Sequence, residues 1–209
     1  SFYAGQHEAE TYRVLASLPL PIFITTNPGD LLGEALAAAG KDPVVEICRW
    51  SEELTTLPSI YDREPDYRPT AQRPLVYHLF GRLDQAESVV LTEDDYFDYL
   101  IGVTSNNDLI PTVVRRALTD TALLFLGFNL DEWDFRVLFR SIMQREGRNR
   151  RGRYAHIAAQ IDPEQGQILE PDGARRYLEE CFGDADISIF WGRVEDFAAE
   201  LAARWKNSQ

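Results

Sequence analysis

An apolar run that ends in a glycine and a polar turn is the feature that most constrains the fold of this chain. Residues 122–126 are apolar without polar alternation, which predicts a central strand buried on both faces. Gly127 follows directly, and a glycine there lets another backbone or a ligand approach the end of the strand. Residues 21–25 and 75–79 have the same construction. Because ligands sit at the carboxyl edge of an open parallel sheet, we expect the three junctions to converge on one crevice.

Strand-like runs alternate with helical patterns along the whole sequence. Strands are expected at residues 21–25, 44–47, 75–79, 122–126, 155–161 and 187–191. Helical patterns lie near residues 7–17, 30–39, 93–101, 109–119, 134–145, 172–181 and 194–205. This alternation predicts an α/β fold with a Rossmann-like, mostly parallel sheet flanked by helices. We expect one domain over residues 1–209, excised from or part of a larger multidomain protein.

The composition and net charge of the chain restrict the classes of molecule that it is expected to bind. The 209 residues carry a formal net charge of −13, which opposes nonspecific binding to nucleic acid and to anionic membranes. No apolar run approaches the ~20 residues that a transmembrane helix needs. No signal-peptide pattern follows Ser1, so we expect a cytoplasmic protein or an excised piece of one. Cys48 and Cys181 lie in periodic segments and are interpreted as packed, inert thiols.

Three short motifs follow one another along the chain. Residues 25–32 read Thr-Thr-Asn, then Pro-Gly-Asp and two leucines. Residues 76–81 read Val-Tyr-His-Leu-Phe-Gly, and an acidic stretch follows at residues 88–96. Residues 125–134 read Phe-Leu-Gly-Phe-Asn-Leu and continue with two spaced aspartates. This order of motifs resembles the sirtuin-like (silent information regulator-like) domain family found in bacterial defence proteins.

Sirtuin-like domains bind NAD and cleave the bond between its nicotinamide and its ribose, so the resemblance implies NAD or ADP-ribose as the ligand. Cleavage builds positive charge on the ribose. An amide at Asn27 is suited to orient water or the nicotinamide carboxamide, and His78 is suited to remove a hydroxyl proton. Asn27 and His78 are therefore the catalytic candidates. The candidates for NAD binding are polar or small residues at the three junctions, namely Thr25, Thr26, Asp30, Gly81, Gly127 and Asn129.

The sequence departs from the family pattern in three places. Phe80 stands where the family has its catalytic histidine, and a phenyl ring cannot accept a proton. His78 lies two residues earlier, on the same face of a strand and about 7 Å away. Asp30 stands one position beyond the family's carboxamide-reading aspartate. The family's first strand and Gly-Ala-Gly loop would precede Thr25 but have no counterpart here, so we expect a truncated piece or an incomplete pocket, and weak NAD binding.

Each candidate also has a purely structural interpretation. Asn27 fits a cap for a helix that begins at Asp30, and His78 on an apolar strand fits a hydrogen-bonded core histidine. Gly127 and Asn129 fit plain turn chemistry. Thr92 followed by an acid three residues later predicts a helix capping box rather than a metal site. The arginines of residues 145–153 form the basic cluster of an acidic chain, as a solvated loop or as a contact for phosphate or a partner.

Three functions from different classes stay open. The first is an NAD- or ADP-ribose-recognising module of a bacterial antiphage-type defence protein, with catalysis weakened or lost. The second is an active NAD⁺ hydrolase that uses His78 and depletes NAD. The third is a structural module that dimerises or docks onto other domains of the parent protein without nucleotide. A zinc-dependent deacetylase is disfavoured because the two CxxC pairs of zinc-ribbon sirtuins are absent, so no metal is expected.

Overall fold

The computed structural model describes residues 2–105, 109–127, 157–162, 172–173, 176, 179 and 187–207. They belong to two compact units, residues 1–114 and 115–209, and each unit has its own three-stranded sheet. Both sheets are parallel throughout, and each of the six predicted strands has a counterpart. The predicted α/β, Rossmann-like class is confirmed, whereas one domain over residues 1–209 stays a prediction.

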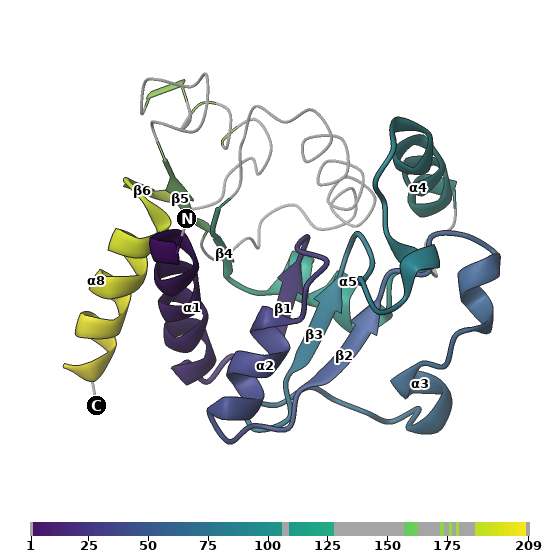
Figure 1. The fold of residues 1–209 in the computed structure, drawn as a ribbon, viewed down its shortest axis with the longest axis horizontal. Coiled ribbons are helices and arrows are strands. Elements are labelled where there is room, and N and C mark those ends of the chain that lie inside the picture. The colour runs from purple at the N-terminus through teal and green to yellow at the C-terminus, as the bar shows by residue number, and fades with distance from the viewer. Residues whose placement is uncertain are drawn as a thin grey trace. The chain divides into compact units, whose positions relative to one another are not determined.

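The sheet of the first unit has β3 at its centre (Figure 1). The flanking strands are β1 (Ile22–Thr25) and β2 (Val44–Ile47), and β3 spans Leu75–His78. Every residue of β3 is buried, as expected for a central strand of a covered parallel sheet. Thr25 lies opposite His78 in the register of β1 and β3, so these two strands end at the same edge.

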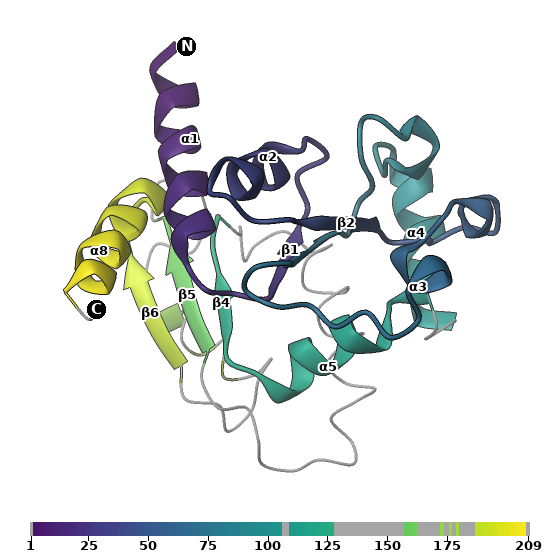
Figure 2. The same cartoon turned by 90° about the horizontal axis from the view of Figure 1, so that it is seen from below.

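Two helices cover one face of this sheet (Figure 2). They are α1 (Phe2–Ser17) and α2 (Leu31–Ala38). Side chains from both helices and from β1 and β3 form one apolar cluster, with Ala16, Phe23, Leu32, Leu36 and Val76 at its centre. This packing fixes the start of α2 relative to the ends of β1 and β3.

The predicted capping box begins α4 (Glu93–Ser105) and is confirmed. Thr92 Oγ1 accepts the amide of Asp95 at 3.1 Å, and Asp95 Oδ2 accepts the amide of Thr92 at 2.9 Å. The hydrogen bond from the Thr92 amide lowers the pKa of the Asp95 carboxyl. The first unit also contains the 3₁₀ helices η1 (Glu53–Thr56) and η2 (Ala86–Ser88) and the α-helix α3 (Ile60–Arg63). The helix α5 (Thr112–Asp120) runs across the boundary between the two units in the sequence.

In the second unit, a buried glutamine joins the ends of the strands. The sheet runs in the order β4 (Leu123–Phe125), β5 (Ile157–Ile161) and β6 (Ile187–Trp191), and α8 (Val194–Lys206) follows. Gln160 on β5 is 3% exposed. Its Oε1 accepts the amide of Gly127 at 2.9 Å, and its Nε2 donates to the carbonyl of Gly192 at 2.7 Å. One side chain thus satisfies backbone groups just beyond both neighbouring strands.

A buried carboxylate holds the long connection between β2 and β3. Glu46 on β2 is 7% exposed, and its oxygens accept the hydroxyl of Ser59 at 3.0 Å and the amide of Ile60 at 2.5 Å. Burial raises the pKa of Glu46, while the bonds from Ile60 and Ser59 oppose that shift. The connection is therefore attached to the sheet at the start of α3.

Replacing Glu46 by alanine is expected to lower the free energy of unfolding by about 2–3 kcal/mol, because it leaves the Ser59 hydroxyl and the Ile60 amide buried without an acceptor. Glu46→Gln keeps an acceptor and is the control. Since the pKa is raised in the folded state, the unfolded chain ionises first as pH increases. Wild type should therefore lose stability relative to Glu46→Gln between about pH 4.5 and neutrality in urea titrations. A difference that is independent of pH would contradict this assignment.

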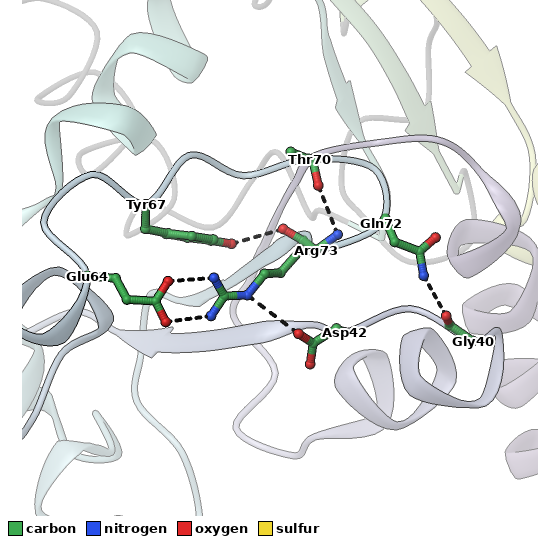
Figure 3. A network of polar contacts seen from close by, with 7 residues as sticks. All are labelled: Gly40, Asp42, Glu64, Tyr67, Thr70, Gln72 and Arg73. Carbon is green, nitrogen blue, oxygen red and sulfur yellow. Dashed lines mark hydrogen bonds and ion pairs between the residues drawn. The ribbon is translucent and has the colours of Figure 1, made fainter.

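A second anchor holds the far end of the same connection (Figure 3). Arg73 makes a bidentate ion pair with Glu64 at 2.6 and 2.9 Å, and a further contact with Asp42 at 3.5 Å. Its guanidinium lies 5.1 Å from the ring centre of Tyr67, whose hydroxyl donates to the Arg73 carbonyl. An open groove of about 440 Å³ lies beside this network, lined by residues 64–68, 70 and 73.

Candidate functional site

The loops after β1 and β3 meet at the carboxyl edge of the first sheet. The amide of Leu79 donates to the Thr25 carbonyl at 2.9 Å, and the amide of Leu83 donates to the Pro28 carbonyl at 3.0 Å. Thr25 and Thr26, both half-buried, belong to the first loop, and Gly81 belongs to the second. The structure therefore brings together the first two of the three predicted junctions. In parallel α/β sheets this edge is where ligands bind.

Asn27 shapes the first loop through every polar group that it has. Its amide donates to Thr25 Oγ1 at 3.0 Å, and its side-chain Oδ1 accepts the amide of Gly29 at 2.8 Å. Its Nδ2 lies 3.5 Å from the hydroxyl of Tyr12 on α1. The predicted alternative, in which Asn27 caps α2, is wrong because Asp30 occupies the N-cap position. Asn27 instead closes a side-chain turn before the helix.

His78 is buried at the end of β3 and is held by the loop after β1. Its side chain is 1% exposed, and Nδ1 donates to the backbone carbonyl of Asn27 at 3.0 Å. A carbonyl only accepts, so Nδ1 carries the proton and Nε2 carries the lone pair of the neutral ring. Nε2 is buried and has no hydrogen-bond partner among the described residues.

Electrostatics keep this imidazole neutral. Burial lowers the pKa of His78, the hydrogen bond to Asn27 opposes the shift, and the positive charge of Arg82 adds to it. A neutral ring with an unprotonated Nε2 is the form that a general base requires. The same nitrogen, however, is closed to solvent, so a ribose hydroxyl reaches it only if neighbouring groups move.

Arg82 joins the two loops and was missed by the sequence analysis. Its Nη2 lies 3.2 Å from Asp30 Oδ2 and 3.0 Å from Asp84 Oδ2. The Arg82 side chain is only 17% exposed. Asp30 therefore faces a guanidinium at this edge, and in the part of the chain that the structure describes its other oxygen is buried without a partner. The signal that could have identified Arg82 in the sequence is its position directly after Gly81, just beyond the end of a predicted strand.

Phe80 lies in an aromatic cluster and not in an open position. Its ring centre is 5.3 Å from that of Tyr96 and 5.3 Å from that of Tyr99. Tyr99 also contacts Trp50 edge to face, with ring centres 6.3 Å apart. The residue at the family's histidine position therefore serves packing between β3 and α4. Cys48 is a free, buried thiol whose pKa burial raises to about 11, as predicted for an inert cysteine, and Cys181 lies outside the described residues.

Gly81 is required by the packing of its own loop. Its φ is +79°, and an added Cβ would lie 2.1 Å from the carbonyl oxygen of Ser88. Ser88 is itself fixed, because its Oγ accepts the amide of Arg82 at 2.9 Å and its carbonyl accepts Trp50 Nε1 at 3.0 Å. This structural need explains the glycine, while a contact of Gly81 with NAD stays a prediction.

The third predicted junction lies in the second unit. Gly127 has φ +69° and is exposed, but its amide is taken by Gln160. Its convergence with Asn27 stays a prediction. Asn129 and the arginines of residues 145–153 lie outside the described residues.

Comparison with known proteins supports the family resemblance that the order of the three motifs indicated. The family model of the SIR2-like domain matches residues 21–182. The chain belongs to the SIR2-like domain family. The sirtuin-like resemblance inferred from the motifs is confirmed, and in this SIR2-like chain the matched span includes Asn27, His78 and Gly127.

Two curated relatives are NAD(+) hydrolases. The chain is 27% identical over 152 residues to NAD(+) hydrolase ThsA of Cytobacillus dafuensis, an alignment that covers 71% of this chain and 27% of the relative. It is 29% identical over 124 residues to NAD(+) hydrolase ThsA of Enterococcus faecium, covering 59% and 23%. The SIR2-like chain thus matches about a quarter of the length of each relative.

Within the described residues, no group of three or more His, Cys, Asp or Glu side chains is arranged to bind a metal. Among the helices of that part of the chain, none is long and apolar enough to cross a membrane.

Proposed function

We propose that this chain is an NAD- or ADP-ribose-recognising module of a bacterial antiphage-type defence protein, cytoplasmic and part of a larger multidomain protein, in which cleavage is weakened or lost. The observation that carries the proposal is the joining of Asn27 and His78 by a hydrogen bond at the carboxyl edge of β1 and β3. The family membership and the two NAD(+) hydrolase relatives support NAD as the ligand.

We expect weakened cleavage because the site lacks an accessible general base. The family's histidine position holds Phe80, which packs against Tyr96 and Tyr99. His78 is neutral but its Nε2 is closed to solvent, so proton transfer from a ribose hydroxyl requires local opening. In this proposal Asn27 holds the nicotinamide carboxamide or water, and Thr25, Thr26, Asp30 and Gly81 line the site. That Gly127 and Asn129 belong to the same site stays a prediction from the third motif.

An active NAD⁺ hydrolase is the second candidate. It is favoured by the unpartnered Nε2 of His78, since a buried acceptor without a donor is costly and is often kept for chemistry. In that case a small movement of the loop after β3 would expose the lone pair to the ribose.

The test is a calorimetric titration of the chain with NAD and with ADP-ribose. We expect dissociation constants in the millimolar range, because the Oδ1 of Asn27 already accepts from Gly29 and a ligand must compete for Nδ2. Asn27→Ala should abolish binding without unfolding the chain. Gln72→Ala is the matched control. It removes an exposed side-chain amide that donates to the Gly40 carbonyl, and Gln72 precedes β3 at the end of the strand opposite to His78. Micromolar binding that survives Asn27→Ala would place the ligand elsewhere, with the arginines of residues 145–153 examined next.

A further inference from the structure

Arg82 has the position and the rigidity of a ligand-binding residue. It directly follows Gly81 at the carboxyl edge of β3, and its amide donates to Ser88 Oγ at 2.9 Å. The tightly packed backbone at Gly81 therefore fixes the position from which the Arg82 side chain extends. Ion pairs with Asp30 and Asp84 fix the position of its guanidinium. A residue held at both ends loses little conformational entropy when it binds a ligand.

Only part of the guanidinium is engaged. Both ion pairs use Nη2, and in the described part of the chain Nε and Nη1 have no partner. A guanidinium offers a planar fork of N–H donors that matches the oxygens of a phosphate. The side chain is 17% exposed, so the donors that remain are held at a fixed place in the site. This arrangement suits an anionic group presented at the sheet edge.

The two carboxylates that pair with Arg82 differ in how exposed they are to solvent, and so in how easily a ligand displaces them. The Asp30 side chain is 34% exposed and stands at the N-cap position of α2, whereas the Asp84 side chain is 58% exposed and lies in the loop after β3. An exposed ion pair contributes little to stability. Asp84 is therefore the partner that a phosphate would displace, and Asp30 would keep the guanidinium oriented.

Arg82 also acts electrostatically on His78. Its positive charge lowers the pKa of the imidazole, while the charges of Asp30 and Asp84 raise it. An anion that displaces Asp84 from Arg82 would replace one negative charge beside His78 by another, so the pKa of the imidazole responds to the difference between the two charges. Ligand charge and base strength are thus coupled within one small cluster.

We propose that Arg82 recognises the diphosphate of the dinucleotide through one fork of its guanidinium, in which Nε or Nη1 acts together with the Nη2 hydrogen that Asp84 releases, and so selects phosphate-bearing ligands over the bare riboside. The proposal rests on the proposed function, and it assigns to Arg82 the contact that discriminates between ligands at that site.

The experiment compares NAD with nicotinamide riboside, which keeps the nicotinamide and ribose but has no phosphate. Both are titrated into the full chain by NMR at constant ionic strength. Arg82→Gln should weaken NAD binding about tenfold or more and leave riboside binding unchanged, as expected for the loss of a charge-assisted hydrogen bond. Asp84→Asn should strengthen NAD binding severalfold, again without effect on the riboside.

The outcomes separate the two proposals. If wild type binds neither ligand, the proposed function fails and the role of Arg82 fails with it. If wild type binds NAD but Arg82→Gln weakens both ligands equally, Arg82 is only a clamp between the loops, and this inference is overturned while the proposed function stands. Should Arg82→Gln fail to fold, Arg82→Lys and Asp84→Asn decide. Lysine keeps the charge without the fork and should lose part of the preference for NAD, and an unchanged preference in both variants refutes the inference.

Discussion

Gly81→Ala is expected to lower the free energy of unfolding by about 4 kcal/mol or more, the largest loss of stability for a single substitution at the candidate site. A left-handed backbone costs a non-glycine residue about 1–2 kcal/mol. The larger part comes from the new Cβ, which would lie 2.1 Å from the Ser88 carbonyl oxygen and 2.6 Å from Ser88 Oγ. Ser88 cannot retreat, because it is fully buried and bonded to Arg82, Gln85 and Trp50.

Gly40→Ala is the matched control for this prediction. Gly40 has the same φ of +79°, but an added Cβ there would meet nothing within 4 Å. Its cost should be limited to the backbone term of about 1–2 kcal/mol. Urea titrations of both variants separate conformational strain from steric overlap. Equal losses in the two variants would mean that the loop after β3 relaxes freely, and that the rigidity ascribed to Arg82 does not exist.

The unmodified chain should release nicotinamide from NAD far more slowly than the ~10 per second of a typical enzyme. The phenyl ring of Phe80 supplies no base, and the Nε2 of His78 is buried. Chromatographic detection of nicotinamide gives the rate. Phe80→His should raise it measurably by restoring an imidazole at the family's position, whereas Phe80→Leu, which removes the ring without adding a base, should not. His78→Ala should change the low wild-type rate little.

A fast wild-type reaction that His78→Ala abolishes would reverse this interpretation. His78 would then be the general base, and the buried Nε2 would be uncovered during turnover. The second candidate function, an active NAD⁺ hydrolase, would replace the first.

The strands, and the edge that β1 and β3 share, could be predicted from sequence because they depend on local patterns. Apolar runs without alternation located β1, β3 and β4 to within a residue or two, and glycines marked their ends. The capping box at Thr92 was likewise local. The family resemblance rested on motif order, which is also linear in the chain.

The polar contacts of the site could not be predicted, because they join distant parts of the chain. Asp30 and Arg82 are 52 positions apart, and nothing in either motif names the other as a partner. Gln160 was treated only as part of a strand, although its amide bonds both Gly127 and Gly192. His78 shows most clearly what could not be predicted from the sequence. The two interpretations offered for it, core histidine and base, each describe one nitrogen of the ring.

The most direct test of the account is to map NAD binding on the amide-correlation NMR spectrum of the chain. The central claim is that the ligand binds where the loops after β1 and β3 meet. Titration should shift the amides of residues 25–27, 29–30 and 78–84, and Asn27→Ala should remove those shifts. Shifts confined to residues 64–73, around the open groove beside Arg73, or to the arginines of residues 145–153 would contradict the claim.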